Sequence, residues 1–248
     1  MSQGGKYAAL KDRINVIFHA HKGRYGYRRV TAAIRQLGQK INHKTVQRLM
    51  REMGLKSLVR PKKYRSYKGN AGEVAPDLIQ RQFTAQGANQ KWVTDVTEFQ
   101  VRGEKLYLSP VMDLFNGEII AYETARRPDF RLVKDRLAKA IDRLDRTEQP
   151  ILHSDQGWHY QMRAYQRLLQ TRGITQSMSR KGNCLDNATM ESFFAVLKSE
   201  FFYLNRFDSI QSLRDGLRGY IRYYNHQRIK LKLKGLSPVQ YRTQSLSS

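Results

Sequence analysis

Three strand signals in a row, between about residues 91 and 125, constrain the fold of this chain most. KWVTDVTEFQV alternates apolar and polar residues from Lys91, and a turn at Arg102-Gly103-Glu104 leads into LYLSPVMDLF. Asn116-Gly117 is a strong hairpin signal, and the strand-like EIIAYETA follows it. Because such short connections join antiparallel neighbours, we expect a three-stranded antiparallel meander here.

Helices and strands alternate after the meander. Apolar residues at helical spacing between Leu132 and Leu144 predict a helix that ends before Pro150, and ILHSDQG predicts a short buried strand. A helix over 161–170, the strand ITQSMS, the polar loop RKGNCLDN and two helices over 189–204 and 208–226 complete the order. This order predicts an α/β domain with a mixed five-stranded sheet and flanking helices.

Positive charge is concentrated in the first third of the chain. Residues 1–75 hold 18 Lys and Arg against 3 Asp and Glu, whereas residues 76–248 hold 27 against 18, so the total of +24 is uneven. Such an excess favours a polyanionic partner, most plausibly nucleic acid. The only cysteine, Cys184, excludes an internal disulfide and a multi-cysteine zinc site.

The basic part also has the pattern of a small all-α domain. Apolar stripes predict three short helices with glycine-containing connections, and Asn42 is a candidate cap for the third. A helix-turn-helix would expose a DNA-contacting face of the third helix; its candidates are Lys44, Gln47, Arg48 and Arg51. A helical bundle with a solvated basic face is the alternative.

These patterns divide the chain into four parts: a helix-turn-helix domain (1–58), a basic linker (59–86), an α/β core domain (87–226) and a C-terminal tail (227–248). Lys62 and Lys63 of the linker are candidate DNA contacts, although a solvated linker has the same composition. The sequence has no run of about 20 apolar residues and no apolar leader, so we expect a cytoplasmic protein without a membrane span.

Three acids are candidates for chemistry. Asp95 lies within a predicted strand, Asp155 follows one, and Glu191 lies in the first turn of a helix. Each has an ordinary alternative, because a strand aspartate is often hydrogen-bonded structure and an acid at a helix start suits the helix dipole. Glu191 and Lys198 fall within ~20° of each other around their helix, away from its apolar stripe, which contains Phe193, Leu197, Phe201 and Leu204.

Convergence of the three acids would require a cation. Two carboxylates ~4 Å apart repel by about 4 kcal/mol at an effective dielectric near 20. Carboxylate oxygens favour Mg²⁺ or Mn²⁺, and a pair of such ions serves phosphoryl transfer. A DNA-binding module attached to such a site predicts an enzyme that cuts or joins DNA.

The segments VTDVTEF, LHSDQGWHY and SMSRKGNCLDNATMESFFAVLKSE resemble the core of DDE transposases of bacterial insertion sequences. The likeness is to the second-reading-frame (OrfB) protein of the IS3 family, in its IS150 subgroup. Thirty-five residues separate Asp155 from Glu191, and Lys198 follows Glu191 by seven, as in that family. The resemblance extends from about Leu10 to Thr243.

This resemblance implies a retroviral-integrase-like, RNase H-like fold with Asp95, Asp155 and Glu191 binding two Mg²⁺ or Mn²⁺ ions. It implies cleavage at transposon ends followed by attack of the freed 3′-hydroxyl on other DNA. Lys198, Arg180 and Lys181 become candidate DNA contacts, and Gly157 is expected to form a turn. The residues expected to position the site rather than bind metal are His153, Asn183 and Asn187.

The family also implies its partners and its location. They are transposon-end and target DNA, a homo-oligomer on that DNA, an upstream-frame (OrfA) product, and the bacterial nucleoid. Zinc is not expected, because His19 and His21 have no cysteine pair. Two alternatives stay open: a non-catalytic DNA-binding regulator that occupies transposon ends, and an RNase H-type nuclease that cuts without joining.

Overall fold

The computed structural model describes residues 7–59, 75–180 and 187–246. Its N-terminal module contains the three predicted helices, α1 (Ala8–Ala20), α2 (Tyr27–Gln36) and α3 (His43–Glu52). Their apolar faces enclose a core of their own. The Asn42 side chain accepts a hydrogen bond from the Lys44 N–H (2.9 Å), so the predicted cap of α3 is confirmed.

One mixed sheet forms the centre of the remaining chain. Its strands are β1 (Lys91–Thr94), β2 (Thr97–Val101), β3 (Glu104–Asp113), β4 (Ile119–Ala125), β5 (Ile151–Ser154) and β6 (Thr175–Met178). β3 pairs antiparallel with β1, β2 and β4, whereas β1, β5 and β6 are parallel neighbours. β1 and β2 pair with β3 in one unbroken register, so they are the first predicted strand divided in two.

The division of that strand follows from a proline. Continuing the register places Pro110 of β3 opposite Asp95, in the gap between β1 and β2. Proline has no N–H to donate to the ladder. The Pro110 carbonyl instead accepts a hydrogen bond from Thr94 Oγ1 (2.8 Å). The strand is thus interrupted at Asp95 and Val96 without a change of register.

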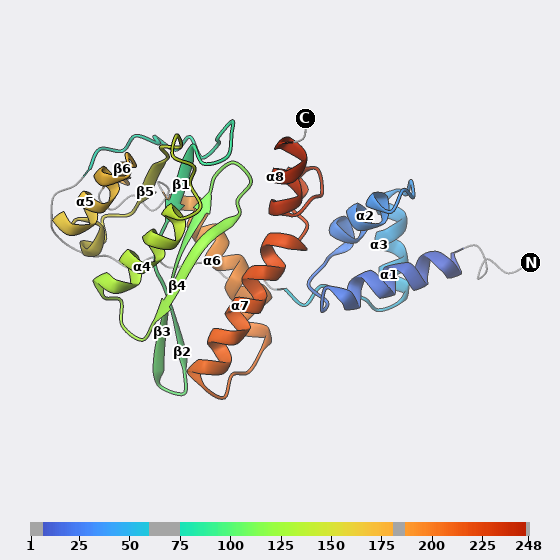
Figure 1. Ribbon diagram of the computed structural model, residues 1–248. Coiled ribbons are helices and arrows are strands. Elements are labelled where there is room, and N and C mark those ends of the chain that lie inside the picture. The colour runs from blue at the N-terminus through green and yellow to red at the C-terminus, as the bar shows by residue number, and fades with distance from the viewer. Residues whose placement is uncertain (1–6, 60–74, 181–186, 247–248) are drawn as a thin grey trace, which may run out of the picture.

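Helices cover both faces of the sheet (Figure 1). α4 (Phe130–Ile141) and α5 (Arg163–Thr171) pack on one apolar cluster, and α6 (Ala188–Glu200) and α7 (Ile210–His226) pack on another. Successive strand residues alternate between them: Trp92 contributes to the first cluster and Val93 to the second.

α6 ends at Glu200, four residues before the predicted end. Phe201 leaves the helical conformation (φ −129°, ψ −61°), and a short 3₁₀ turn, Phe202–Leu204, follows. Leu204 is therefore 38% exposed instead of continuing the predicted apolar stripe.

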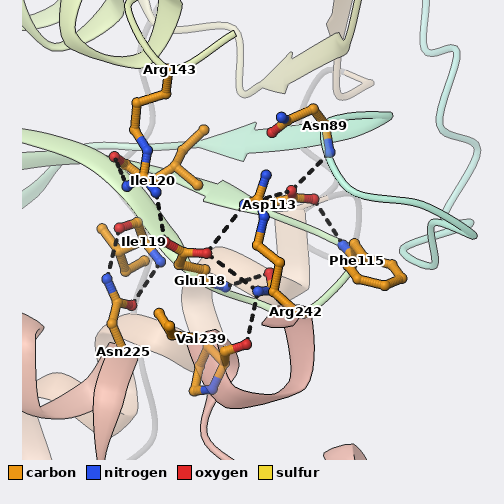
Figure 2. Close-up of polar contacts among 12 residues, drawn as sticks. Asn89, Asp113, Phe115, Glu118, Ile119, Ile120, Arg143, Asn225, Val239 and Arg242 are labelled. Atoms are coloured by element: carbon orange, nitrogen blue, oxygen red, sulfur yellow. Dashed lines mark hydrogen bonds and ion pairs between the residues drawn. The ribbon is translucent and has the colours of Figure 1, made fainter. Parts of the chain in front are cut away.

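The segment predicted as a C-terminal tail packs against the core. It contains α8 (Pro238–Leu246), whose Arg242 donates to Glu118 Oε2 (3.1 Å) and lies 3.6 Å from Asp113 Oδ2. Arg143, which follows α4, donates to the other Glu118 oxygen (3.0 Å), so two arginines from distant parts of the chain hold one buried carboxylate (Figure 2). Buried acids require such partners, and they fix this segment in place.

Part of the stretch predicted as a linker also lies against the core. The Leu78 N–H donates to Ser177 Oγ (2.9 Å), and the Met178 N–H donates to the Pro76 carbonyl (3.3 Å). Ile79 is fully buried among core residues. Residues 75–79 therefore cover β6 instead of spanning open solvent.

Candidate active site

Asp95 occupies the break between β1 and β2. The Val96 N–H, which has no ladder partner in this break, donates to Asp95 Oδ1 (2.7 Å). The side chain of Asp95 is partly buried. The interruption caused by Pro110 therefore gives the carboxylate a fixed backbone donor at the end of β1.

Asp155 directly follows β5, the parallel neighbour of β1. Val93 lies opposite His153 in that pairing, so the chain leaves both strands at the same edge of the sheet. The carboxyl ends of parallel strands are the usual place for functional groups in α/β domains. The sequence-predicted Asp95 and Asp155 are thus brought together.

Gly157 serves close approach rather than turn formation. Its φ is −58°, which any residue adopts, so the expectation that the turn itself needs glycine is wrong. A Cβ at this position would lie 3.0 Å from Asp155 Oδ1 and 3.1 Å from His159 Nε2. The Gly157 N–H also donates to Asp155 Oδ1 (3.0 Å). Glycine therefore lets the carboxylate and the imidazole approach the same small space.

The pKa values of both aspartates are raised. Burial raises the pKa of Asp95 well above the ordinary aspartate value, and the charge of Asp155 raises it further. Burial also raises the pKa of Asp155, although the hydrogen bond from Gly157 opposes this. Carboxylates in such a pair favour a shared proton or a bound cation. Strongly perturbed acids of this kind are typical of functional sites.

α6 brings Glu191 to the same pair. The Asn187 side chain precedes α6 and donates from Nδ2 to the carbonyl of Thr94 (3.2 Å), the residue before Asp95. The charge of Glu191 raises the pKa of Asp95, by less than Asp155 does. Burial raises the pKa of Glu191 itself. The aspartates therefore form the tighter pair, with Glu191 acting on it from the helix.

Lys198 faces the acids from the same helix. Burial lowers its pKa, and the charges of Glu98 and Asp95 oppose that decrease. Its Nζ lies 5.4 Å from the centre of the Phe99 ring. The charges of both Glu191 and Lys198 act on Asp95, which agrees with the common face that helical spacing predicts for these two residues.

Two of the three residues predicted to position the site lie in the described structure. His153 is fully buried in β5, and its Nδ1 lies 2.8 Å from Ser177 Oγ of β6, which joins the two strands behind Asp155. Asn187 connects the start of α6 to β1, as described above. Asn183 lies outside the described residues.

Apart from the half-buried Lys198, the predicted DNA contacts are exposed wherever they are described. The four candidates on α3 are all exposed: Lys44, Gln47, Arg48 and Arg51. Arg48 also donates to Glu52 (2.8 Å) one turn later. Arg180 lies 3.8 Å from a carboxylate oxygen of Asp77. Three further candidates fall outside the described residues: Lys62, Lys63 and Lys181.

A buried arginine behind the aspartates was not predicted. Arg136 of α4 has no exposed surface, and its guanidinium donates to Thr94 Oγ1 and to the Tyr165 hydroxyl (3.0 Å). Burial raises the pKa of Tyr160 well above its usual value, while the charge of Arg136 opposes this and the charges of Asp155 and Asp95 add to it. A buried cation therefore lies 5.9 Å from the centre of the Tyr160 ring, and the charges of both aspartates also act on this tyrosine.

The sequence does contain a signal for Arg136. It falls midway between Leu132 and Ala140, at the spacing of four that defines the buried stripe of α4. A charged residue at a core position needs partners or a function. Local sequence patterns also gave no prediction for Trp158 and His159, which follow Asp155 by three and four residues.

The donor set suits a hard divalent cation. Asp95, Asp155 and Glu191 offer the carboxylate oxygens that Mg²⁺ and Mn²⁺ prefer, and the raised pKa values of the pair mark charge that a cation would neutralise. Within residues 7–59, 75–180 and 187–246, no three Asp, Glu, His or Cys side chains are grouped closely enough to hold one ion. The residue types fit a metal, but the full triad is not closed around one point.

Comparison with known proteins identifies the family. Integrase core domain models match residues 85–184 and 191–246, and an HTH-like domain model matches residues 6–63. The InsK protein for insertion sequence element IS150 of Escherichia coli K12 is 56% identical over 99% of this chain and 87% of its own length. Transposase InsF for insertion sequence IS3A, also of Escherichia coli K12, is 35% identical over 93% of this chain and 81% of its own length. This chain belongs to the IS3 family of DDE transposases.

Solved structures confirm the fold of this transposase. The catalytic core domain of HTLV-2 integrase, in complex with magnesium, aligns with TM-scores of 0.51 for its dimeric form and 0.52 for its trimeric form. The identities are 17% and 16%, and each alignment covers 63% of the transposase and 98% of the integrase chain. The predicted RNase H-like core and helix-turn-helix-like module are thus confirmed. In the described part of the transposase, no helix is long and apolar enough to cross a membrane.

Proposed function

We propose that this transposase cuts DNA at the ends of its insertion sequence and joins the freed 3′-hydroxyl to other DNA, with Asp95, Asp155 and Glu191 as its catalytic acids. The observation that supports this most is the pair of aspartates at adjacent strand ends, whose pKa values burial raises, with the charge of Asp155 adding to the shift at Asp95. Glu191 acts on the same carboxylate from α6. Two acids at adjacent strand ends and a third on α6 beside them suit phosphoryl transfer once the third closes on the pair.

The same three acids are the proposed ligands of Mg²⁺ or Mn²⁺, two ions in the complete site. When bound, the metal lowers the pKa of a water or hydroxyl nucleophile and stabilises charge on the attacked phosphate. The aspartates already interact strongly, so they provide the preformed part. The pKa of Glu191 is raised by burial and not by the charge of an aspartate, and we propose that DNA binding brings Glu191 into the ligand set.

Other residues of the chain hold the DNA and the acids. Lys198 lies beside the acids and would neutralise a phosphate of the transposon end. The exposed basic face of α3 would contact the duplex further away. Two transposon ends require at least two active sites, so we also propose a homo-oligomer on DNA, with the upstream-frame product as a possible partner at the nucleoid.

The test is a cleavage and joining assay on labelled DNA that carries the ends of the insertion sequence encoding this chain, with Mg²⁺. We expect cleaved and joined products from the wild type and none from Asp155→Asn or Glu191→Gln. Both variants remove one negative charge at nearly constant volume, so binding of the same DNA in a gel-shift assay should be retained.

Equal loss of cleavage and binding in Asp155→Asn would contradict the assigned role. Binding without products from every protein would favour the regulatory alternative. In that case the assay is repeated with the upstream-frame product added, and products that appear only then restore the proposal.

A further inference from the structure

Trp158 presents an aromatic surface to solvent beside the acid pair. It lies in the 3₁₀ turn Trp158–Tyr160, three residues after Asp155, and is 49% exposed. Three residues of chain span at most roughly 11 Å, so the backbone of Trp158 lies within that distance of Asp155. The only other tryptophan, Trp92, has no exposed surface. Tryptophan is mostly buried in folded proteins, which makes this exposure at a site informative.

The turn that carries Trp158 is held firmly. The Tyr160 N–H donates to the Gly157 carbonyl (3.0 Å), and the side chain of Gln156 donates to the Ser179 carbonyl (3.0 Å). The indole meets the ring of His159 edge-on, with centroids 5.4 Å apart, and His159 meets Tyr160 in the same way at 4.2 Å. A side chain fixed in this way loses little freedom when a flat ligand packs on it.

His159 adds a second sign of a ligand. It is 8% exposed, and neither of its ring nitrogens has a hydrogen-bond partner within the described residues. Its Nε2 and Asp155 Oδ1 face the same space beside Gly157. Buried polar groups are normally satisfied, and a polar group of a bound nucleotide would satisfy this one.

We propose that Trp158 stacks on a DNA base that leaves the duplex next to the phosphate served by Asp155. This rests on the proposed function above, and it adds the recognition of an unpaired base to it. Removing a base from a duplex is costly, and stacking on an aromatic side chain offsets part of that cost without demanding one sequence. The base comes from the transposon end or from the target DNA, and both offer the same π-surface.

The test is a double-mutant cycle between the side chain and the base. DNA affinity is measured in the Asp155→Asn background, so the result does not depend on cleavage. Trp158→Ala is compared with its parent on transposon-end DNA and on target DNA, each carrying a single abasic site moved one position at a time around the cleaved bond. We expect Trp158→Ala to bind intact DNA about tenfold more weakly than its parent does. On DNA that lacks the stacked base, the two proteins should bind equally.

At one abasic position, the affinity losses from Trp158→Ala and from the missing base should not add. Whether that position lies in the transposon end or in the target DNA identifies the source of the base. Trp158→Phe should keep most of the affinity, because it retains an aromatic face. Tyr203→Ala, which removes another exposed aromatic ring outside the acid site, should behave like the parent. Quenching of tryptophan fluorescence on DNA binding should disappear in Trp158→Phe, because Trp92 is buried.

The proposal would be overturned if the affinity losses from Trp158→Ala and from the abasic site added at every position of both DNAs. An equal loss in Trp158→Ala and Trp158→Phe would also overturn it. The exposed position of Trp158 makes a folding defect unexpected, and matching thermal melts of the variants check this directly.

Discussion

At Asp95 and Asp155, the N–H groups of Val96 and Gly157 each donate to a carboxylate oxygen. These bonds favour the ionised form, yet the pKa of each aspartate is still raised, because burial outweighs them. The fold therefore binds protons more tightly at these positions than the unfolded chain does. Its stability falls as the pH rises from the ordinary aspartate value through the raised one.

This linkage predicts that Asp95→Asn stabilises the metal-free protein. The asparagine carbonyl can still accept from Val96, but it carries no charge to repel Asp155. In chelator at neutral pH we expect the melting temperature to rise, by about 2–4 °C for each kcal/mol recovered in a chain of this size. The gain should vanish below the ordinary aspartate pKa, where both proteins are neutral at this position.

Asp208→Asn is the matched control, because its side chain is 89% exposed and pairs only with solvent-exposed Arg102 in the described structure. It should leave the melting temperature unchanged at every pH. A melting temperature of Asp95→Asn at or below that of the wild type at neutral pH would contradict the electrostatic account.

The sequence predicts the acids of this site better than their surroundings. Asp95, Asp155 and Glu191 stand out through motif and spacing, whereas the role of Arg136 depends on Thr94 and a tyrosine that the fold brings to it. The need for glycine at position 157 is likewise visible only from the two side chains that approach it in the fold, those of Asp155 and His159. Contacts between segments far apart in sequence leave little trace in local composition.

At the scale of elements, α6 is fixed at both ends. Asn187 joins its start to the carbonyl of Thr94 beside Asp95. At its other end, the Glu200 carboxylate accepts hydrogen bonds from the Arg228 guanidinium at 2.7 Å on each oxygen, and Oε2 accepts one from the Tyr220 hydroxyl (3.0 Å). The position of Glu191 relative to the aspartates is thus set by contacts at both termini of the helix.

We therefore expect Asn187→Ala to slow cleavage by about ten- to a hundredfold, because small misplacements of a catalytic group have effects of this size. Loss of the bond to Thr94 should also destabilise the fold by ~1 kcal/mol. Asn205→Ala is the control, since Asn205 Nδ2 donates to the Phe201 carbonyl just beyond the other end of α6. Its stability loss should be similar and its cleavage rate unchanged; equal slowing in both variants would show that stability alone governs the rate.

The elements themselves follow closely from the sequence. Turn residues and strand alternation predict the meander, and the sequence predicts helices α1 to α7, whereas α8 lies in the segment predicted as a tail. The break at Asp95 depends on Pro110 across the sheet, which no local pattern reveals. The packing of α8 depends on the hydrogen bond from Arg242 to Glu118, which lies 124 residues earlier in the chain. The local composition of residues 227–248 therefore predicted only a tail.

At the scale of the whole molecule, the helical module docks on the end of α6. Arg29 of α2 donates to Glu200 Oε1 (3.1 Å), and Arg24 donates to the Glu200 backbone carbonyl (2.9 Å). The Ile229 N–H donates to the hydroxyl of Tyr25 (2.7 Å), and Ile229 joins the apolar core of the module. Figure 1 shows α7 and α8 between the sheet and the three N-terminal helices. The helix that carries Glu191 is therefore also the support of the DNA-binding module.

Glu200 links the two parts electrostatically. Burial opposes its ionisation, but hydrogen bonds from Arg228 and the charges of Arg228 and Arg29 lower its pKa, so it is an anion at neutral pH. Removing Arg29 leaves that buried anion with fewer donors, and hydrogen bonds to charged groups contribute about 1.5–3 kcal/mol. The lost free energy weakens the contact between the helical module and the core, because Arg228 still binds Glu200 within the core.

Arg29→Ala should therefore lower the melting temperature of the helical module and separate its transition from that of the core in scanning calorimetry. Arg28→Ala removes the same charge from the adjacent position, and the contacts described for Arg28 are with Tyr27 alone. It should leave the calorimetric trace unchanged. If both variants melt alike, Glu200 does not couple the modules, and the docking would then depend on the apolar contacts around Ile229.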